Sequence, residues 1–336
     1  MNKNSLSDIR YSVLDLAVIT EGQSPADAIN NSRDLAQHVE DWGYTRFWMA
    51  EHHNMENIAS SATSVLLGHA AEATESLRIG SGGVMLPNHS PLVIAEHYGT
   101  LATLYPDRID LGLGRAPGTD QKTAQAIRPD RMQQVRQFPQ NVKQLQQYFS
   151  VDNSSADVRA IPGEGTEVPL WILGSSTDSA HLAAALGLPY VFASHFSPQQ
   201  LNAALEVYRD KFEPSEQLDE PYVMPCVNTI VADTDEQAEY LSTSLKQMFM
   251  GVITGNRDPM PPPVDDMNTV WNLRERMAVE QMLKYTFLGS KETVKEELSN
   301  FVEETKADEI MTATYVYDHD QRLKSHRLLS EIMSGQ

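Results

Sequence analysis

The stretch FWMAEHHN, residues 47–54, ends an apolar run with a carboxylate and two adjacent imidazoles, Glu51, His52 and His53. Imidazole titrates near neutral pH, so a histidine at a strand end can move a proton or hydrogen-bond to an oxyanion. A neighbouring carboxylate can orient such a ring or pair with another group. The triplet is therefore either part of a chemical site or a polar cap on the strand.

A metal centre is the first chemistry to weigh, because several candidate ligands lie close together in the sequence. They are Glu51, His52, His53, His69, His89 and His97. Their spacing matches no standard zinc pattern, and adjacent residues at a strand end point to opposite sides, so His52 and His53 do not share one ion easily. His69 and His97 fall in predicted helices. We predict no metal site, with a metal-dependent hydrolase as the weaker alternative.

A second cluster, LGSSTDS at residues 173–179, suits the binding of an anion. Gly174, Ser175 and Ser176 are small, so backbone amides can approach a ligand closely, and the following helix begins with unpaired N–H donors. Arg115, which follows another predicted strand, could add a bidentate contact to the same phosphate. The alternative is an ordinary helix cap by Ser176 or Thr177.

The glycines in LGLGRAPG, residues 111–118, give a GxGxxxG spacing. This spacing is only a weak match to a dinucleotide-binding fingerprint. Pro117 interrupts it, no clear acidic ribose anchor follows, and the first predicted strand lacks the motif. The pattern does not favour a Rossmann domain.

The elements that would position these clusters alternate between short apolar runs and stretches with helical spacing. The runs predicted as strands are 11–19, 45–49, 77–84, 108–113, 169–173, 189–192, 222–231 and 309–315. Eight strands separated by helices predict a (β/α)8 TIM barrel, with an open doubly wound sheet as the alternative. In a barrel, the carboxyl ends of the strands share one face, so clusters that follow four different strands would meet there.

The helical stretches and insertions complete the predicted domain. Residues 27–42 follow a Ser-Pro start, and one face of a glutamine-rich helix carries Met132, Val135, Phe138, Val142 and Leu145. Insertions fall at about 116–130, 153–166 and 251–266, and the last contains PPP, which excludes a helix or a central strand. We predict one domain over residues 1–336, with residues 251–266 as a lid-like loop.

Composition narrows the class of protein and its partners. The 336 residues carry a net charge of −20 and no basic stripe, which argues against binding nucleic acid or anionic membranes. The single cysteine, Cys226, excludes an internal disulfide framework. We find no secretory signal and no apolar run of about 18 residues, so the sequence predicts a cytoplasmic protein.

Four motifs in order give a resemblance to a known family. They are WMAEHH, RIGSGGVMLPNHSP, PDRIDLGLGRAPG and WILGSSTDSAHLAAALGLPYVFASHF. Together they resemble the bacterial luciferase-like, flavin-dependent monooxygenases, and most closely their single-subunit branch. The match covers residues 11–196 and, more loosely, 308 to the end. It implies a TIM barrel that uses FMN.

The resemblance implies roles for individual residues. The family's histidine that is implicated in the reaction of flavin with oxygen falls on His52, and Glu51 is the residue that could orient it. The family's non-proline cis peptide beneath the flavin ring would fall between Gly82 and Gly83. His53 is expected to pack or to bond to backbone.

The phosphate end of the flavin would be bound by matched residues. Arg115 matches the arginine that binds the FMN phosphate, and Ser175, Ser176 and Ser179 match the phosphate-binding turn, next to Gly174. Two departures stand out. The reactive cysteine of the luciferases is Gly114 here, which argues against luminescence, and residues 251–266 have no clear match, which argues against an aldehyde substrate.

The implied function is that of an oxidoreductase acting on paired donors with incorporation of molecular oxygen. Reduced FMN would be a cosubstrate supplied by a separate NAD(P)H-flavin reductase, a small organic molecule would be the substrate, and a homodimer is expected from the family. One alternative is an F420- or FMN-dependent reductase or dehydrogenase on the same barrel. A second is a non-catalytic flavin-binding protein.

Overall fold

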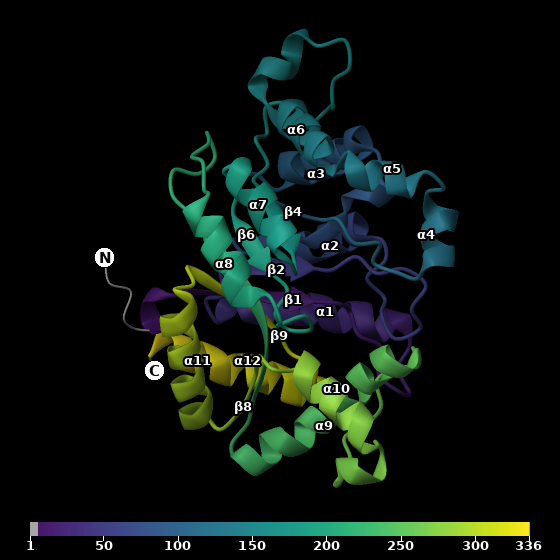
Figure 1. Cartoon of the computed structure of the whole chain (residues 1–336), viewed down its shortest axis with the longest axis vertical. Coiled ribbons are helices and arrows are strands. Elements are labelled where there is room, and N and C mark those ends of the chain that lie inside the picture. The colour runs from purple at the N-terminus through teal and green to yellow at the C-terminus, as the bar shows by residue number, and fades with distance from the viewer. Residues whose placement is uncertain (1–5, 336) are drawn as a thin grey trace.

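The computed structural model describes residues 6–335, with strands in the middle of the molecule and helices around them (Figure 1). The strands form a closed ring of parallel pairs. The strands are β1 (Arg10–Asp15), β2 (Arg46–Met49), β3 (Arg78–Met85), β4 (Ile109–Gly114), β5 (Leu170–Gly174), β6 (Tyr190–Phe192), β7 (Val223–Val231), β8 (Thr286–Gly289) and β9 (Glu309–Ala313). Strands β1 to β6 pair in sequence order, β6 pairs with β7, β7 with β9, and β9 with β1. Eight strands therefore close a barrel, which confirms the predicted (β/α)8 TIM-barrel fold.

Helices connect the strands and surround the ring. The α-helices are α1 (Pro25–Asp41), α2 (Thr63–Glu72), α3 (Pro91–Leu104), α4 (Gln121–Ile127), α5 (Arg131–Arg136), α6 (Phe138–Phe149), α7 (Thr177–Ala185), α8 (Leu201–Asp210), α9 (Asp235–Thr254), α10 (Leu273–Met282), α11 (Lys291–Thr305) and α12 (His319–Ser334). Short 3₁₀ turns are η1 (Leu6–Asp8), η2 (Leu86–Asn88), η3 (Val151–Ser155) and η4 (Met267–Thr269). Helix α1 shows how the sequence sets a boundary: Ser24 and Asp27 form a capping box and Pro25 occupies the first turn.

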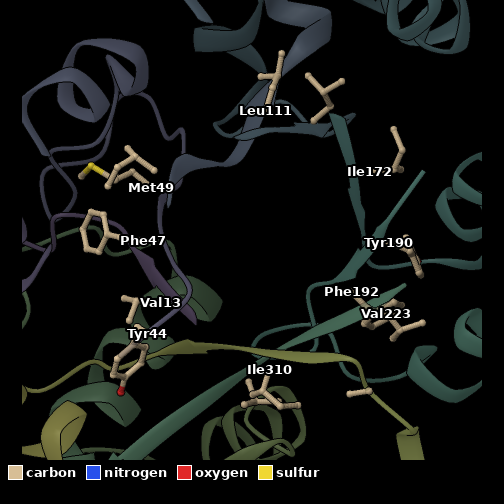
Figure 2. Packing of buried hydrophobic residues seen from close by; sticks show 14 of the residues in the cluster. Val13, Tyr44, Phe47, Met49, Leu111, Ile172, Tyr190, Phe192, Val223 and Ile310 are labelled. Carbon is tan, nitrogen blue, oxygen red and sulfur yellow. The ribbon is translucent and has the colours of Figure 1, made fainter. Parts of the chain in front are cut away.

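The apolar core has two layers, because side chains alternate across each strand. One set, including Val13, Phe47 and Ile172, packs between the strands and the helices. Figure 2 shows labelled members of this set arranged around the ring of strands. The residues next to them in sequence, such as Leu14 and Trp48, belong to a second cluster inside the barrel. Both faces of the strands are thus buried, as parallel sheets require.

Three details of the chain path differ from the prediction. The sequence prediction missed β8, which pairs with the distal half of β7 and lies outside the ring. The glutamine-rich helix is broken into α5 and α6 because Pro139 has no N–H for a continuous helix, and the side chain of Met132 is 68% exposed. Helix α9 continues through Gly251 to Thr254, so the proline-rich loop begins at Gly255, which ends the helix in a left-handed conformation.

A buried ion network lies at the amino-terminal end of the barrel. Arg46 donates to Asp110 at 2.7 Å and to Glu309 at 3.1 Å, and Arg78 also donates to Asp110. Burial alone would raise the pKa of Asp110, but the two guanidinium groups outweigh burial and lower it. Buried charges need such partners, so this end of the barrel is filled by a satisfied polar network. The carboxyl end is where a ligand has room.

Candidate functional site

A cavity of about 700 Å³ lies within the barrel and its carboxyl-end loops. Eight of the nine predicted site residues line it: His52, Gly82, Gly83, Arg115, Gly174, Ser175, Ser176 and Ser179. They follow or end strands β2, β3, β4 and β5, so the topology brings together the clusters that the sequence scatters over more than a hundred positions. Glu51 is the predicted residue that does not line the cavity.

Close packing beside the cavity requires glycine at positions on β3 and β4. A Cβ atom on Gly82 would lie 2.5 Å from Leu14 Cδ1, and one on Gly112 would lie 2.1 Å from the carbonyl oxygen of Ser81. The Gly82–Gly83 peptide bond is cis, as the resemblance implied. Gly112 belongs to the GxGxxxG pattern, which here reflects close packing of neighbouring barrel strands. It marks no dinucleotide fingerprint.

Glu51 lies directly behind the cavity wall and binds two imidazoles. Nε2 of His53 and Nε2 of His89 both donate to its Oε1 at 2.8 Å, and the Met85 amide donates to Oε2 at 3.1 Å. Burial alone would raise the pKa of Glu51, but these hydrogen bonds outweigh burial and hold the pKa at about 2. The expectation was that His53 packs or bonds to backbone: its amide donates to the Gly118 carbonyl at 3.0 Å, but its ring bonds to the Glu51 side chain. Among residues 6–335, the hydrogen bonds of Glu51 do not include one to His52.

His52 lines the cavity and is partly buried. Its Nδ1 atom has no hydrogen-bond partner among the residues that the structure describes. Burial lowers the pKa of His52 to about 4, against an opposing effect of the Glu51 charge. At neutral pH the ring is therefore uncharged, with one nitrogen as a donor and the other as an acceptor. Because Nδ1 is itself buried, Nε2 is the ring nitrogen that a ligand in the cavity can reach.

A second imidazole, which the sequence prediction missed, lines the same cavity. His195 follows β6, and its Nδ1 also lacks a partner within residues 6–335. Burial lowers its pKa to about 3, and the nearby His52 contributes to the shift. The backbone around it is held by buried side chains: Asn228 donates to the carbonyl of His195 at 2.7 Å, and Ser194 donates to that of Cys226 at 2.6 Å.

The turn between β5 and α7 is built around Gly174. A Cβ atom there would lie 2.0 Å from Ser179 Oγ, so only glycine fits. Ser179 Oγ lies 2.7 Å from the carbonyl of Ser176, to which it donates, and 2.9 Å from the Tyr190 hydroxyl. The single proton of Ser179 is thus used inside the turn, and the Ser179 hydroxyl shapes the turn rather than pointing a free donor at a ligand. The backbone amides of Ser175 and Ser176, at the start of α7, remain the candidate anion donors.

Two arginines stand at this end of the cavity. Arg115 is about half exposed and lies 3.5 Å from Asp178, which is itself 72% exposed, so the pair is weak. Arg131, at the start of α5, was not predicted. It donates to the Arg115 carbonyl at 2.7 Å and to Asn88 at 2.9 Å. Arg131 therefore fixes the loop that carries Arg115 and adds a second positive charge to the lining.

The opposite wall of the cavity is apolar. It is formed by side chains of β7, α9, β9 and the residues after β9, namely Cys226, Met248, Phe249, Met311 and Tyr315. Cys226 is 1% exposed, and burial raises the pKa of its thiol, so it stays protonated. All the charged side chains in the lining belong to arginines, Arg115, Arg131 and Arg257. In a chain of net charge −20, this cavity is therefore suited to anions and apolar groups.

Comparison with known proteins gives the family. Residues 9–309 match the family model described as luciferase-like monooxygenase. The chain belongs to the luciferase-like monooxygenase family. It is 50% identical over 333 residues to the uncharacterised protein YvbT of Bacillus subtilis, covering 99% of each chain. It is 49% identical to a luciferase-like monooxygenase of Escherichia coli K12 (96% and 97% covered) and 33% identical to the N-acetyl-S-alkylcysteine monooxygenase of B. subtilis (96% and 98%).

Solved structures of similar fold include apo-MsnO8, with a TM-score of 0.86 and 32% identity over 96% of this chain and 98% of that one. Two more distant structures share the fold. The oxygenating constituent of 3,6-diketocamphane monooxygenase from Pseudomonas putida, in complex with FMN, has a TM-score of 0.72 at 14% identity (98% of each chain). An F420-dependent secondary alcohol dehydrogenase has a TM-score of 0.68 at 15% identity (95% and 97%).

Neither a metal-binding group nor a membrane-spanning helix is found within the residues that the structure describes. No group of three or more His, Cys, Asp or Glu side chains within residues 6–335 is arranged to hold a metal ion. The carboxylate of Glu51 with its two imidazoles is thus a hydrogen-bonded cluster. Over the same residues, every helix is too short or too polar to cross a membrane.

Proposed function

We propose that this protein is an FMN-dependent monooxygenase that oxygenates a small organic substrate. Reduced FMN, O₂ and the substrate would give oxidised FMN, the oxygenated substrate and water, with the two electrons supplied by the flavin. A separate NAD(P)H-flavin reductase would regenerate the reduced cofactor. The observation that carries the proposal is one cavity that joins an arginine-lined anion end to an apolar interior with two neutral imidazoles.

The residues present fit FMN. Arg115, Arg131 and the amides of Ser175 and Ser176 would hold the phosphate, because guanidinium groups and helix N-termini are favourable partners of a dianion. Gly82 and Gly83 line the cavity with backbone alone, against which a flat ring could lie. When bound, reduced flavin supplies the electrons that activate oxygen.

The chain's own contribution is a dry, pre-organised site. His52 and His195 are neutral at pH 7, so each can offer its Nε2 atom, as donor or acceptor according to the tautomer, to oxygen atoms or to the substrate, and each can hold or pass a proton. Met248, Phe249 and Met311 keep water from the reacting atoms. Glu51 contributes indirectly: its carboxylate fixes the rings of His53 and His89, and these rings support the loops that carry the site.

Relatives support the reaction class. The N-acetyl-S-alkylcysteine monooxygenase, 33% identical to this chain, is named for a thioether substrate, and the diketocamphane enzyme of the same fold is seen with FMN. A thioether is therefore a sensible first substrate. The F420-dependent dehydrogenase shares the fold. The second candidate function is therefore that of a reductase or dehydrogenase that uses F420.

The deciding experiment is a flavin titration. Oxidised and photoreduced FMN, and in parallel F420, are titrated into the protein and followed by fluorescence or calorimetry. We expect saturable FMN binding that Arg115→Ala weakens by about 1.5–3 kcal/mol, the scale of a charged hydrogen bond. Arg274→Ala, on the exposed face of α10, is the matched control. Tight binding of F420 alone would favour the dehydrogenase, and no binding of either cofactor would remove both proposals.

A further inference from the structure

The third arginine of the cavity lining lies away from the proposed phosphate end in the sequence. Arg257 is carried by residues 256–266, the loop that extends α9, and α9 also supplies Met248 and Phe249 to the apolar wall. Arg115 and Arg131 belong to the segment that follows β4. The cavity therefore has a third arginine, which is carried by the loop after α9 and not by the segment that follows β4.

Arg257 has donors to spare. Its Nη1 donates to the Asn54 carbonyl at 3.0 Å and to Asp120 Oδ2 at 3.3 Å. Within the part of the chain that the structure describes, these are the hydrogen bonds that Arg257 makes. A guanidinium has five N–H donors, so the Nε and Nη2 groups are left for a ligand. The side chain is 36% exposed and Asp120 is 34% exposed, so the ion pair is weak and can be exchanged for another carboxylate.

Asp120 already has other partners that hold it in place. Its Oδ1 caps α4 by accepting from the Lys122 and Thr123 amides, and its Oδ2 accepts from Thr123 Oγ1 at 2.8 Å. The loss of Arg257 would therefore leave Asp120 satisfied. Within residues 6–335, the cavity lining contains three arginines and no carboxylate side chain, and the carboxylate that competes for Arg257 is that of Asp120.

We propose that the substrate is a small apolar carboxylic acid, whose carboxylate pairs with Arg257 while its apolar part lies against Met248, Phe249 and Met311. This inference rests on the proposed function, since it names the substrate class of the same cavity. A single carboxylate suits one guanidinium with two free donor groups in a fork. The thioether side chains of Met248 and Met311 suit the apolar part of the substrate, because methionine adapts its shape to irregular aliphatic groups.

The test uses two probes that differ only in charge, hexanoate and hexanamide, titrated calorimetrically into the FMN-loaded protein. We expect hexanoate to bind at least about tenfold more tightly, which corresponds to one charged hydrogen bond. Arg257→Gln should abolish that preference and leave hexanamide binding and FMN affinity unchanged. Arg274→Gln, an exposed arginine on α10, should change nothing.

A second variant removes the competing carboxylate. Asp120→Asn keeps an oxygen for the helix cap, because asparagine caps helices as well as aspartate does. Hexanoate should then bind several-fold more tightly than to the wild type, with hexanamide unaffected.

The outcomes separate this inference from the proposed function. If FMN does not bind to the wild type, the proposed function fails. If FMN binds but hexanoate and hexanamide bind equally, or neither binds, the substrate class is wrong. If Arg257→Gln instead weakens FMN as much as Arg115→Ala does, Arg257 belongs to the phosphate site and the inference is overturned.

Discussion

Nε2 of His89 donates to Glu51 Oε1 at 2.8 Å and so ties the turn after β3 to the end of β2. A carboxylate only accepts, so the Nε2 atom carries the proton, and the His53 ring is fixed in the same way from within its own loop. The carboxylate thus organises two loops at the edge of the cavity. His52, between Glu51 and His53 in sequence, is left free to face the cavity.

Glu51→Gln should therefore destabilise the protein rather than abolish its chemistry. An amide keeps one acceptor oxygen but loses the charge, so we expect the free energy of unfolding to fall by about 1–3 kcal/mol at pH 7. The folded pKa of about 2 lies below the unfolded value, so this stabilisation is present above about pH 4.5 and is lost as the pH falls toward 2. Urea unfolding of the variant should lack that acid-dependent loss. Glu296→Gln, on the exposed face of α11, is the control, and equal stability of both variants would contradict the assignment.

His52→Gln and His195→Gln should separate catalysis from binding. Each ring lines the cavity, and its Nδ1 atom is buried with no hydrogen-bond partner within residues 6–335, which leaves Nε2 for a ligand. We expect FMN affinity to change little, while oxygenation of a thioether probe by photoreduced FMN falls by ~10²–10⁴, the usual cost of losing an acid or base. Sulfoxide is measured by mass spectrometry. Unchanged sulfoxide formation in both variants would favour a non-catalytic flavin-binding protein.

The barrel could be predicted from sequence because parallel strands are buried on both faces and read as apolar runs. Strand β8 was not predicted because it has four residues and pairs with the outer half of β7 alone. The break between α5 and α6 was signalled by Pro139 and was missed because the apolar spacing continues across it. These errors leave the barrel intact, since none of them changes the ring of eight strands.

The site was only partly predictable from the sequence, because only some of its residues directly follow a strand. Residues that directly follow a strand can be found from sequence, because the fold places every strand end on one face. His195 follows β6 and obeys that rule, although its strand has three residues and gave a weak signal. Arg131 and the bonds of Glu51 depend on contacts between distant segments, such as Arg131 with the Arg115 carbonyl. No local pattern reports such contacts.

Stability should fall in mild acid because burial keeps several histidines uncharged, among them the two that line the cavity. The folded pKa values of about 4 for His52 and about 3 for His195 lie below the ordinary 6.5, so the unfolded chain binds protons first. Stability is then complete above about pH 6.5 and falls as the pH drops toward 4. Between pH 7 and pH 5, each ring should cost about 2 kcal/mol. His52→Gln should remove one such contribution in urea titrations at the two pH values, whereas the exposed His181→Gln should leave the difference intact.

Two glycine substitutions should act in opposite directions. Gly174→Ala forces a Cβ atom to within 2.0 Å of Ser179 Oγ, so the turn before α7 must move. We expect a loss of about 1–3 kcal/mol in stability and weaker FMN binding, since the same turn presents the Ser175 and Ser176 amides. In Gly68→Ala, on α2, the new Cβ meets Leu101 at an ordinary 3.4 Å and should stabilise the helix by about 0.5–1 kcal/mol. Thermal unfolding with and without FMN measures both. A tolerated Gly174→Ala would show that the turn is not constrained as described.

Trypsin should cut the loop after α9 at Arg257. The contacts of the loop and of the Arg257 side chain predict the rate of this cleavage. Met260 is anchored by backbone hydrogen bonds with Ile19 and Glu21. The Val264 amide donates to Thr243 Oγ1 and Gln247 donates to the Pro262 carbonyl, so the loop beyond Arg257 is held at several points. Among residues 6–335, the hydrogen bonds of the Arg257 side chain are those to Asn54 and Asp120. Asp120→Asn should therefore speed cleavage after Arg257 by up to about fivefold, the worth of one exposed ion pair. FMN together with hexanoate should slow cleavage, because a bound carboxylate holds the guanidinium inside the cavity. Fragment masses over time give the cleavage rates with and without the Asp120→Asn change and with and without ligands. If neither the Asp120→Asn change nor FMN with hexanoate alters the rate, residues 256–266 do not act as a lid.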